Sequence, residues 1–166
     1  MNSSKTPKGY MTTTVQTTNL RAVCTQCHEA FETFGLPDIL YGAKLLYTVD
    51  GQRAAFLACL GNPVCDEVSR MLNGPLRNMA SDLGRTDLFD MAIGAACDPL
   101  DGVPLDATAR QACPHCGSRE VNVYDQSGYQ TRQLPVVTHH EWSSLPQAQR
   151  LKRIQQRLSE RPSGIG

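Results

Sequence analysis

Two pairs of cysteines with identical spacing constrain this chain more than any other feature of its sequence. Cys24 and Cys27 form one Cys-x-x-Cys pair, and Cys113 and Cys116 form the other. This spacing lets two thiolates on one tight turn reach a single tetrahedral metal ion, at about 2.3 Å from each sulfur. Gly117 follows the second pair and can adopt the positive φ angle that closes such a turn. The two pairs together predict zinc as the cofactor.

The rest of the sequence is consistent with reduced thiols. The chain has 166 residues and seven cysteines. It contains no run of the roughly 18 apolar residues that a transmembrane helix requires, and its N-terminus lacks the apolar stretch of a secretory signal. We therefore expect a cytoplasmic protein with no membrane partner, in which the cysteines are free to bind metal rather than form disulfides.

Each pair also matches another class of site. Cys24-Thr-Gln-Cys-His28 has the pattern of a c-type haem attachment motif, but haem attachment requires export to an oxidising compartment. Cys113-Pro-His-Cys116 has the pattern of a dithiol redox motif, in which the first cysteine begins a helix. The residues after it indicate a strand instead. Buried cysteines without a metal are a third alternative, and zinc fits the two pairs better than any of these.

A further part of the sequence suggests additional ligands. Phe56-Leu-Ala-Cys59 ends a strand-like stretch, and Cys65 follows after a proline. With the first Cys-x-x-Cys pair, these cysteines give residues 22–66 a pattern that resembles the four-cysteine zinc fingers at the C-terminal end of bacterial type I topoisomerases. Two features differ from that family: the gap before Cys59 is longer, and an acidic pair follows the last cysteine where a basic residue is common.

This resemblance implies that the first pair shares an ion with Cys59 and Cys65. The second pair then needs other ligands, for which the candidates are His139, His140 and Cys97. In a competing scheme, the two Cys-x-x-Cys pairs form one zinc ribbon with helices inserted between them, and Cys59 and Cys65 are core residues. Both schemes use all four cysteines of the two pairs, and we expect one zinc ion or, with Cys59 and Cys65 as ligands, two.

The overall pattern predicts an α+β fold, built from zinc-ribbon β-hairpins with a small helical middle and an amphipathic C-terminal helix. Residues 1–20 are polar and rich in Thr and Ser, which indicates a disordered leader. We expect a first zinc-ribbon segment over residues 21–66, the helical middle over 67–106, and a second segment with a hairpin and the last helix over 107–160. In this fold the metal replaces a large hydrophobic core.

Turn and cap signals set the expected boundaries of the elements. Asp50-Gly51 supplies the positive φ angles of a hairpin turn between two strand-like stretches. Asn62 and Pro63 predict the N-cap and first residue of a helix. The other expected elements are a short helix over 76–83, a helix capped by Thr86, strands over 121–124 and 133–138 joined by a turn at Ser127-Gly128, and a last helix opened by a capping box of Ser144 and Gln147.

The last helix carries two stripes of side chains. Its apolar stripe, which we expect to pack on the second hairpin near Trp142, consists of Leu145, Ala148, Leu151, Ile154 and Leu158. Arg150, Arg153 and Arg157 recur at steps of three and four, so they share another face. This face is a candidate for binding nucleic-acid phosphates, and the alternative is a solvated helix surface.

These features favour a non-enzymatic, zinc-stabilised binding module that recognises nucleic acid or a protein that works on nucleic acid. Sites rich in thiolate are usually closed and structural, whereas a catalytic zinc keeps a position for water. His139-His140-Glu141 lacks the spacing of a zinc protease motif. The alternative is a protein–protein adaptor whose interface is the acidic middle of the chain. An oxidoreductase that uses Cys113 and Cys116 is a third, less favoured hypothesis.

Overall fold

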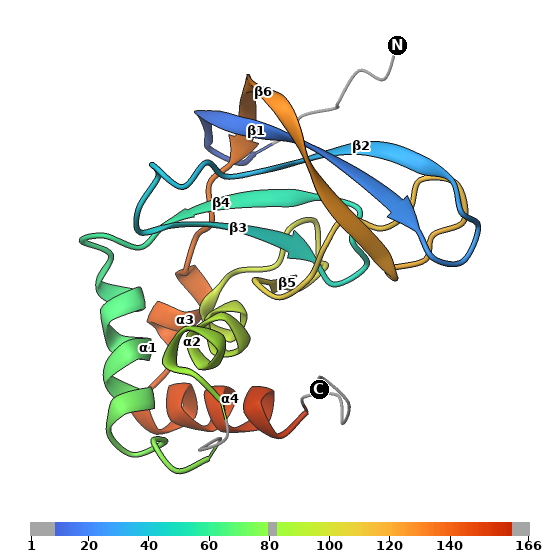
Figure 1. The fold of residues 1–166 in the computed structure, drawn as a ribbon. Coiled ribbons are helices and arrows are strands. Elements are labelled where there is room, and N and C mark those ends of the chain that lie inside the picture. The colour runs from blue at the N-terminus through green and yellow to red at the C-terminus, as the bar shows by residue number, and fades with distance from the viewer. Residues whose placement is uncertain (1–8, 80–82, 161–166) are drawn as a thin grey trace.

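The computed structural model describes residues 9–79 and 83–160, apart from the side chain of Arg85. It shows a mixed α/β protein in which two small antiparallel sheets lie on one side and the helices on the other (Figure 1). Four α-helices are present among the described residues, and none of them is long and apolar enough to cross a membrane.

The first sheet has β1 (Thr12–Cys24) at its centre, between β2 (Ala30–Gly35) and β6 (Val121–Pro135). The expected disordered leader is therefore corrected for residues 12–20, which form most of β1; residues 1–8 lie outside the described part of the chain. The Thr-rich stretch suits a strand because β-branched side chains pack well on a pleated surface. Val15 and Thr17 are buried, and Thr17 Oγ1 donates a hydrogen bond to the Gln130 carbonyl at 2.8 Å.

β6 is one long strand where the sequence predicts two strands and a turn. It pairs with β1 from Thr12 opposite Pro135 to Cys24 opposite Val121. The register shifts in the middle, because Thr18 lies opposite Tyr129 and Leu20 opposite Asp125. Gly128, with a φ of 107°, lies in the extra residues of β6, so Ser127-Gly128 forms a bulge rather than a turn.

The second sheet contains β4 (Ala54–Ala58), β3 (Ala43–Thr48) and β5 (Leu105–Asp106), in that order. The predicted hairpin between β3 and β4 is confirmed. Gly51 has a φ of 70° in its turn, and Thr48 Oγ1 donates a hydrogen bond to Asp50 Oδ1 at 2.6 Å. A bridge between Phe56 and Val136 connects this sheet to the end of β6.

The first helices begin close to where the sequence indicates. α1 (Pro63–Asn73) is capped by Asn62, whose side chain accepts hydrogen bonds from the Val64 and Cys65 amides, as predicted. α2 (Arg85–Ile93) has Gly84 at its N-cap instead of Thr86, and the short 3-10 helix η1 (Gly94–Ala96) continues it. Of the helix expected over 76–83, residues 76–79 form turns, and residues 80–82 lie outside the described part.

The last helix, α4 (Gln147–Ser159), begins later than predicted, because Ser144, its expected cap, is instead the last residue of an unpredicted short helix, α3 (His140–Ser144). The later start follows from Pro146, which has no amide hydrogen and disfavours helical geometry at Leu145 before it. The capping box is therefore absent, because Pro146 itself is the N-cap of α4 and makes no side-chain cap bond.

α4 packs against α2 and η1, and not on a hairpin as predicted. Ile154 and Leu158 are buried in this contact, whereas Ala148 of the expected apolar stripe is exposed. The main hydrophobic core lies between the helices and the second sheet, and Trp142, with 1% of its surface exposed, is its largest fully buried side chain. Trp142 is therefore a packing anchor.

Candidate metal centre

The first Cys-x-x-Cys pair lies in the connection from β1 to β2. Cys24 is the last residue of β1, and its amide donates a hydrogen bond to the Glu29 carbonyl at 3.0 Å. The His28 amide donates to the Cys24 carbonyl, also at 3.0 Å. His28 has a φ of 63°, an unusual angle for a residue other than glycine. These bonds turn Cys27 back towards the end of the strand.

The second pair forms the same turn just before β6. The Cys113 amide donates to the Ser118 carbonyl at 2.8 Å, and the Gly117 amide donates to the Cys113 carbonyl at 2.8 Å. Gly117 has a φ of 78°, which confirms the role predicted for it in closing the turn. The hydrogen bonds join the same relative positions in both turns, so the two pairs form equivalent turns, of the knuckle type that can bind metal.

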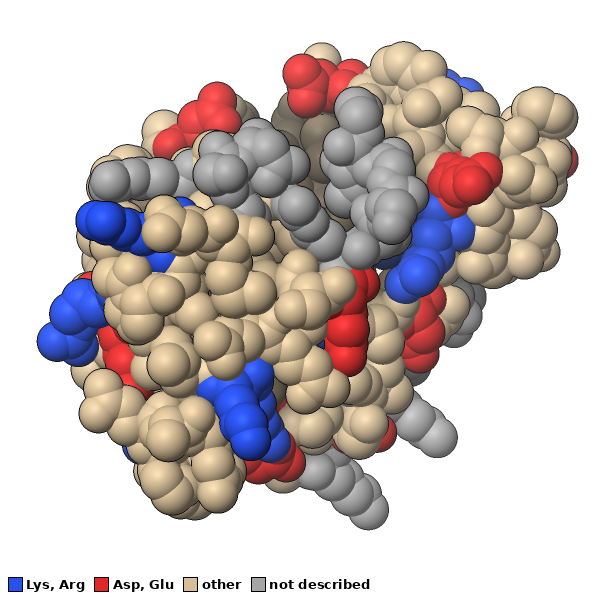
Figure 2. Space-filling model, turned by 90° about the horizontal axis from the view of Figure 1, so that it is seen from below, with Lys and Arg blue, Asp and Glu red and all other residues tan. Residues whose placement is uncertain are grey.

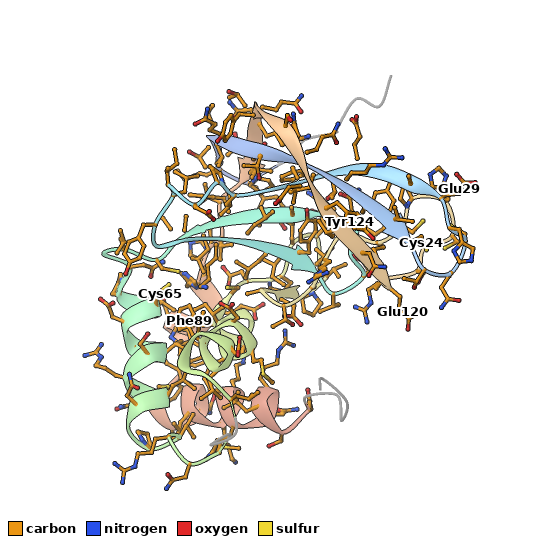
Figure 3. All side chains as sticks on the ribbon, in the orientation of Figure 1. Cys24, Glu29, Cys65, Phe89, Glu120 and Tyr124 are labelled. Atoms are coloured by element: carbon orange, nitrogen blue, oxygen red, sulfur yellow. The ribbon has the colours of Figure 1, made fainter. Side chains whose placement is uncertain are left out.

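Strand pairing brings the two knuckles together. Cys24 lies opposite Val121 in the β1–β6 ladder, and the amide and hydroxyl of Thr25 both donate to the Glu120 carbonyl at 2.9 Å. Figure 3 shows Cys24 at one end of the molecule, with Glu29 and Glu120 on the connections around it. The sequence gives no local signal for the contact between Thr25 and Glu120, because 95 positions separate them.

The four sulfurs form a compact group. The Sγ atoms of Cys24, Cys27, Cys113 and Cys116 all lie within 4.8 Å of one another. Cys24 Sγ lies 3.5 Å from Cys116 Sγ, and Cys27 Sγ lies 3.6 Å from Cys113 Sγ. A tetrahedral zinc ion with bonds of about 2.3 Å requires sulfurs about 3.8 Å apart. The donor set therefore fits a four-coordinate thiophilic ion, and each distance is much longer than the roughly 2.05 Å of a disulfide.

The knuckle backbone polarises the thiols unequally. The Cys27 amide hydrogen bond is the largest of the effects that lower the pKa of Cys24 to about 6, against the effect of burial. The pKa of Cys27 rises to about 12, because burial and hydrogen bonds with the other three thiols outweigh the amide of Glu29. The lowered pKa thus favours the thiolate form of Cys24 before a metal binds. Binding a cation deprotonates the remaining thiols, as ligation requires.

A small separate core surrounds this group. It consists of Ala22, Cys24, Phe31, Cys113 and Val121, with Cys27 packed against it. Apart from the cysteines, this cluster contains only three side chains, so apolar burial gives this end of the first sheet little stability. A metal ion bound by the four thiols would therefore take the place of a hydrophobic core here.

The other predicted ligands lie elsewhere. Cys59 and Cys65 belong to the main core, and Figure 3 shows Cys65 at the far end of the molecule from Cys24. Cys97 is buried and its thiol donates to the Ile93 carbonyl at 3.2 Å. Within the described residues, the only cluster of metal-binding side chains is that of the two Cys-x-x-Cys pairs. The grouping of the cysteines thus matches the competing scheme, in which the two pairs share one site and Cys59 and Cys65 are core residues.

The two histidines are occupied by hydrogen bonds. His139 Nδ1 lies 2.6 Å from the Ala96 carbonyl oxygen, and its Nε2 lies 3.3 Å from Asn62 Nδ2. His140 Nδ1 lies 3.1 Å from Asp98 Oδ2. These contacts hold the start of α3 against the end of η1, so both histidines have structural partners far from the four cysteines.

A substitution at Cys59 tests this assignment of ligands. We expect the Cys59→Ala variant to retain the full amount of bound zinc, because Cys59 lies in the main core and not at the metal centre. The loss of one half-buried thiol should cost only about 1 kcal/mol of stability. Elemental analysis of the purified variant measures the metal, with Cys27→Ser as the matched variant that should lose it. A fall in zinc content as large as that of Cys27→Ser would instead support the scheme in which Cys59 and Cys65 are zinc ligands.

The three arginines predicted to bind phosphate all lie beside carboxylates of this chain. Arg150 Nη1 lies 3.0 and 3.1 Å from the two carboxylate oxygens of Glu67, and Arg150 also donates to the carbonyls of Leu145 and Ser143. Arg157 pairs with Asp106 at 3.3 Å, and Arg153 with Glu141 at 3.5 Å. The sequence did not indicate these partners, which come from other elements.

Among the described residues, the surface around α4 shows no concentration of positive charge. Seen from the helical side, Lys and Arg side chains are scattered between Asp and Glu side chains (Figure 2). The chain as a whole has 16 basic and 16 acidic residues. This distribution differs from the basic patch by which proteins bind the nucleic-acid backbone.

Comparisons of the chain with protein-family models, with curated proteins and with solved structures found no match. The metal centre and the surfaces beside it are therefore the features from which a function can be inferred. The likeness of residues 22–66 to topoisomerase zinc fingers stays a prediction from the sequence.

Proposed function

We propose that this protein is a zinc-stabilised, non-enzymatic binding module whose partner is another protein. The observation that carries the proposal is the convergence of four thiols from two equivalent knuckles. Such a site supplies four protein ligands to one ion, which leaves no position for water or substrate and is typical of structural zinc. Bound zinc would link the turn after β1 to the turn before β6.

Bound zinc would hold β6 in place as an exposed edge strand. The order of the first sheet is β2-β1-β6, so within the described residues the outer edge of β6 has no neighbouring strand. Its residues from 122 to 131 are all exposed on both faces of the strand. The outer edge therefore presents backbone donors and acceptors to solvent, which is the arrangement that binds an extended peptide by strand addition.

Large side chains lie on the same strand. Val123, Tyr124 and Tyr129 are 37%, 54% and 63% exposed, respectively. Tyrosine is enriched at protein interfaces because it combines apolar area with a hydroxyl group that can form hydrogen bonds. The edge and these side chains together favour a protein segment in extended conformation as the partner.

Single-stranded nucleic acid is a second candidate. Tyr124 lies opposite Arg21 in the β1–β6 ladder, and an exposed aromatic ring beside a guanidinium group can stack a base. Glu32 of β2 lies opposite Arg21 in the β1–β2 ladder, and its negative charge would repel a phosphate group there. The protein partner is therefore the favoured candidate.

Site-specific photo-crosslinking in cells tests this proposal. We expect a photoreactive amino acid at Tyr124 or Tyr129 to give a defined crosslinked species that contains another polypeptide. The same group at Gln155, an exposed position on α4, should give none, because α4 lies on the helical side of the molecule. Equal crosslinking from Gln155 and from β6 would contradict the proposal.

Fluorescence anisotropy with single- and double-stranded oligonucleotides separates the two candidates. We expect no binding that weakens with salt, and no change when Arg150, Arg153 and Arg157 are replaced together by Gln. Salt-dependent binding of single strands that is lost in Tyr124→Ala would establish the nucleic-acid candidate instead.

A further inference from the structure

Three cysteines remain outside the metal centre, and two of them form a pair. Cys59 follows the last residue of β4, and Cys65 is the third residue of α1. Each thiol is the largest influence on the pKa of the other. Cys65 lies at the opposite end of the molecule from Cys24 (Figure 3), and Cys59 lines the same cavity as Phe89.

A hydrogen-bonded turn fixes the positions of both cysteines. The Cys59 amide donates to the Gly42 carbonyl at 2.7 Å, and the Cys59 carbonyl accepts from the Asn62 amide at 3.1 Å. The Asn62 side chain accepts from the Cys65 amide at 3.4 Å and donates to the Ala58 carbonyl at 3.3 Å. The backbones of both cysteines are therefore bonded to the same residue, Asn62, so one tight turn places Cys59 and Cys65 near each other without help from a metal.

The two thiols differ in accessibility. Cys59 is half-buried and lines a cavity of about 760 Å³ beside Lys44, whereas Cys65 is 3% exposed. Reagents from solution can thus reach Cys59 but not Cys65. This combination of one accessible and one adjacent buried thiol is typical of a reactive cysteine with a resolving partner.

The electrostatic surroundings distinguish the two thiols in the same sense. The hydrogen bond from Cys65 and the charge of Lys44 lower the pKa of Cys59, against the effects of burial and of Asp90. The pKa of Cys65 is raised by its hydrogen bond with Cys59 and by burial. Lys44 is held in place by Asp90 at 2.5 Å and by the ring of Phe89, whose centre lies 5.5 Å away.

We propose that Cys59 and Cys65 form a reversible disulfide, with Cys59 as the attacking thiol and Cys65 as the resolving thiol. This modification site is independent of the proposed function and of the metal centre. Its oxidant is a low-molecular-weight disulfide, a class for which glutathione disulfide is the probe.

The exchange takes place in two steps. The Cys59 thiolate attacks one sulfur of the oxidant, so that a mixed disulfide forms, the sulfur–sulfur bond of the oxidant breaks, and one thiolate leaves and takes up a proton. Cys65 then loses its proton to water and attacks the Cys59 sulfur. The bond between Cys59 and Cys65 forms and the second small thiolate leaves. Two protein thiols are oxidised, and one small disulfide is reduced to two thiols.

The test uses the full, zinc-loaded chain equilibrated with mixtures of reduced and oxidised glutathione. The chain has no Lys or Arg between Arg53 and Arg70, so trypsin releases both cysteines on one peptide, residues 54–70. After free thiols are blocked with an alkylating agent, we expect this peptide to lose two hydrogen atoms and to carry no alkyl group. The zinc content should stay constant, and Cys97→Ala should behave like the unchanged protein.

Two matched variants test the assigned roles. In Cys65→Ser the mixed disulfide on Cys59 should accumulate, because no resolving thiol is left. In Cys59→Ser the adduct on Cys65 should be at least about tenfold less abundant, since that thiol is buried and protonated. Equal adducts in the two variants, a peptide 54–70 that keeps both free thiols in oxidised glutathione, or release of zinc before the disulfide forms would each overturn the proposal.

Discussion

Replacing Cys113 with serine should abolish metal binding and unfold the end of the first sheet that carries the knuckles. Cys113 is 1% exposed and belongs both to the sulfur group and to the small core around it. A structural zinc contributes about 10 kcal/mol or more to folding, which is comparable to the whole stability of a typical domain. The three apolar side chains of the small core cannot compensate for that loss.

The effect should be local, because the main core is built from other elements. Hydrogen exchange should show loss of protection in β2 and in the adjacent halves of β1 and β6, while α1 and α4 keep theirs. Elemental analysis should find less than about a tenth of an equivalent of zinc, compared with one in the unchanged protein. Removing the metal with a chelator should give the same exchange pattern. A variant that keeps a full equivalent of zinc and its protection would contradict the assigned centre.

Replacing Trp142 with alanine should be the most destabilising single change in the main core. The ring is 1% exposed, so its removal leaves a cavity and should cost about 3–5 kcal/mol. Trp142 Nε1 also donates a hydrogen bond to Glu67 Oε2 at 2.8 Å, and the Arg150 guanidinium lies 5.8 Å from the ring centre. The substitution therefore disturbs a polar contact as well as the packing.

Two further variants separate these contributions in urea unfolding followed by far-ultraviolet circular dichroism. Trp142→Phe keeps much of the ring volume but loses the N–H donor, and should cost about 1–3 kcal/mol through the partly buried Glu67. Tyr129→Ala removes an aromatic ring that is 63% exposed, and should change stability by no more than about 0.5 kcal/mol. An unfolding midpoint for Trp142→Ala equal to that of Tyr129→Ala would show that Trp142 is not a packing anchor.

The local features of the structure follow from the sequence. Two knuckles, the Asp50-Gly51 hairpin and the Asn62 cap of α1 all occur where the sequence predicts them. Each of these depends on a few neighbouring residues: a glycine with positive φ, a side chain that caps the next turn, or two thiols on one turn. Such signals are complete within a short stretch of sequence.

Where sequence reasoning failed, a distant partner or a nearby conflict decided the outcome. Residues 12–20 look like a polar leader on their own, but pairing with β6 makes them a strand. The glycine of Ser127-Gly128 is used in a bulge because the flanking residues are already paired with β1. At Leu145-Pro146 the local signal was present, since a proline disfavours helical geometry in the residue before it, but the expected capping box of Ser144 and Gln147 placed the start of the last helix too early.

The sequence by itself determined that four cysteines lie in two turns of the kind that binds metal, but only the tertiary structure decided which cysteines meet. Cys24 and Cys116 are 92 positions apart, and the β1–β6 ladder sets their sulfurs 3.5 Å from each other. The same holds for Arg150. Its charge suggested a phosphate-binding residue, but in the fold its guanidinium pairs with Glu67, which is 83 positions away in the sequence. Spacing fixes the geometry within one turn, whereas contacts between turns depend on strand register and packing across the whole fold.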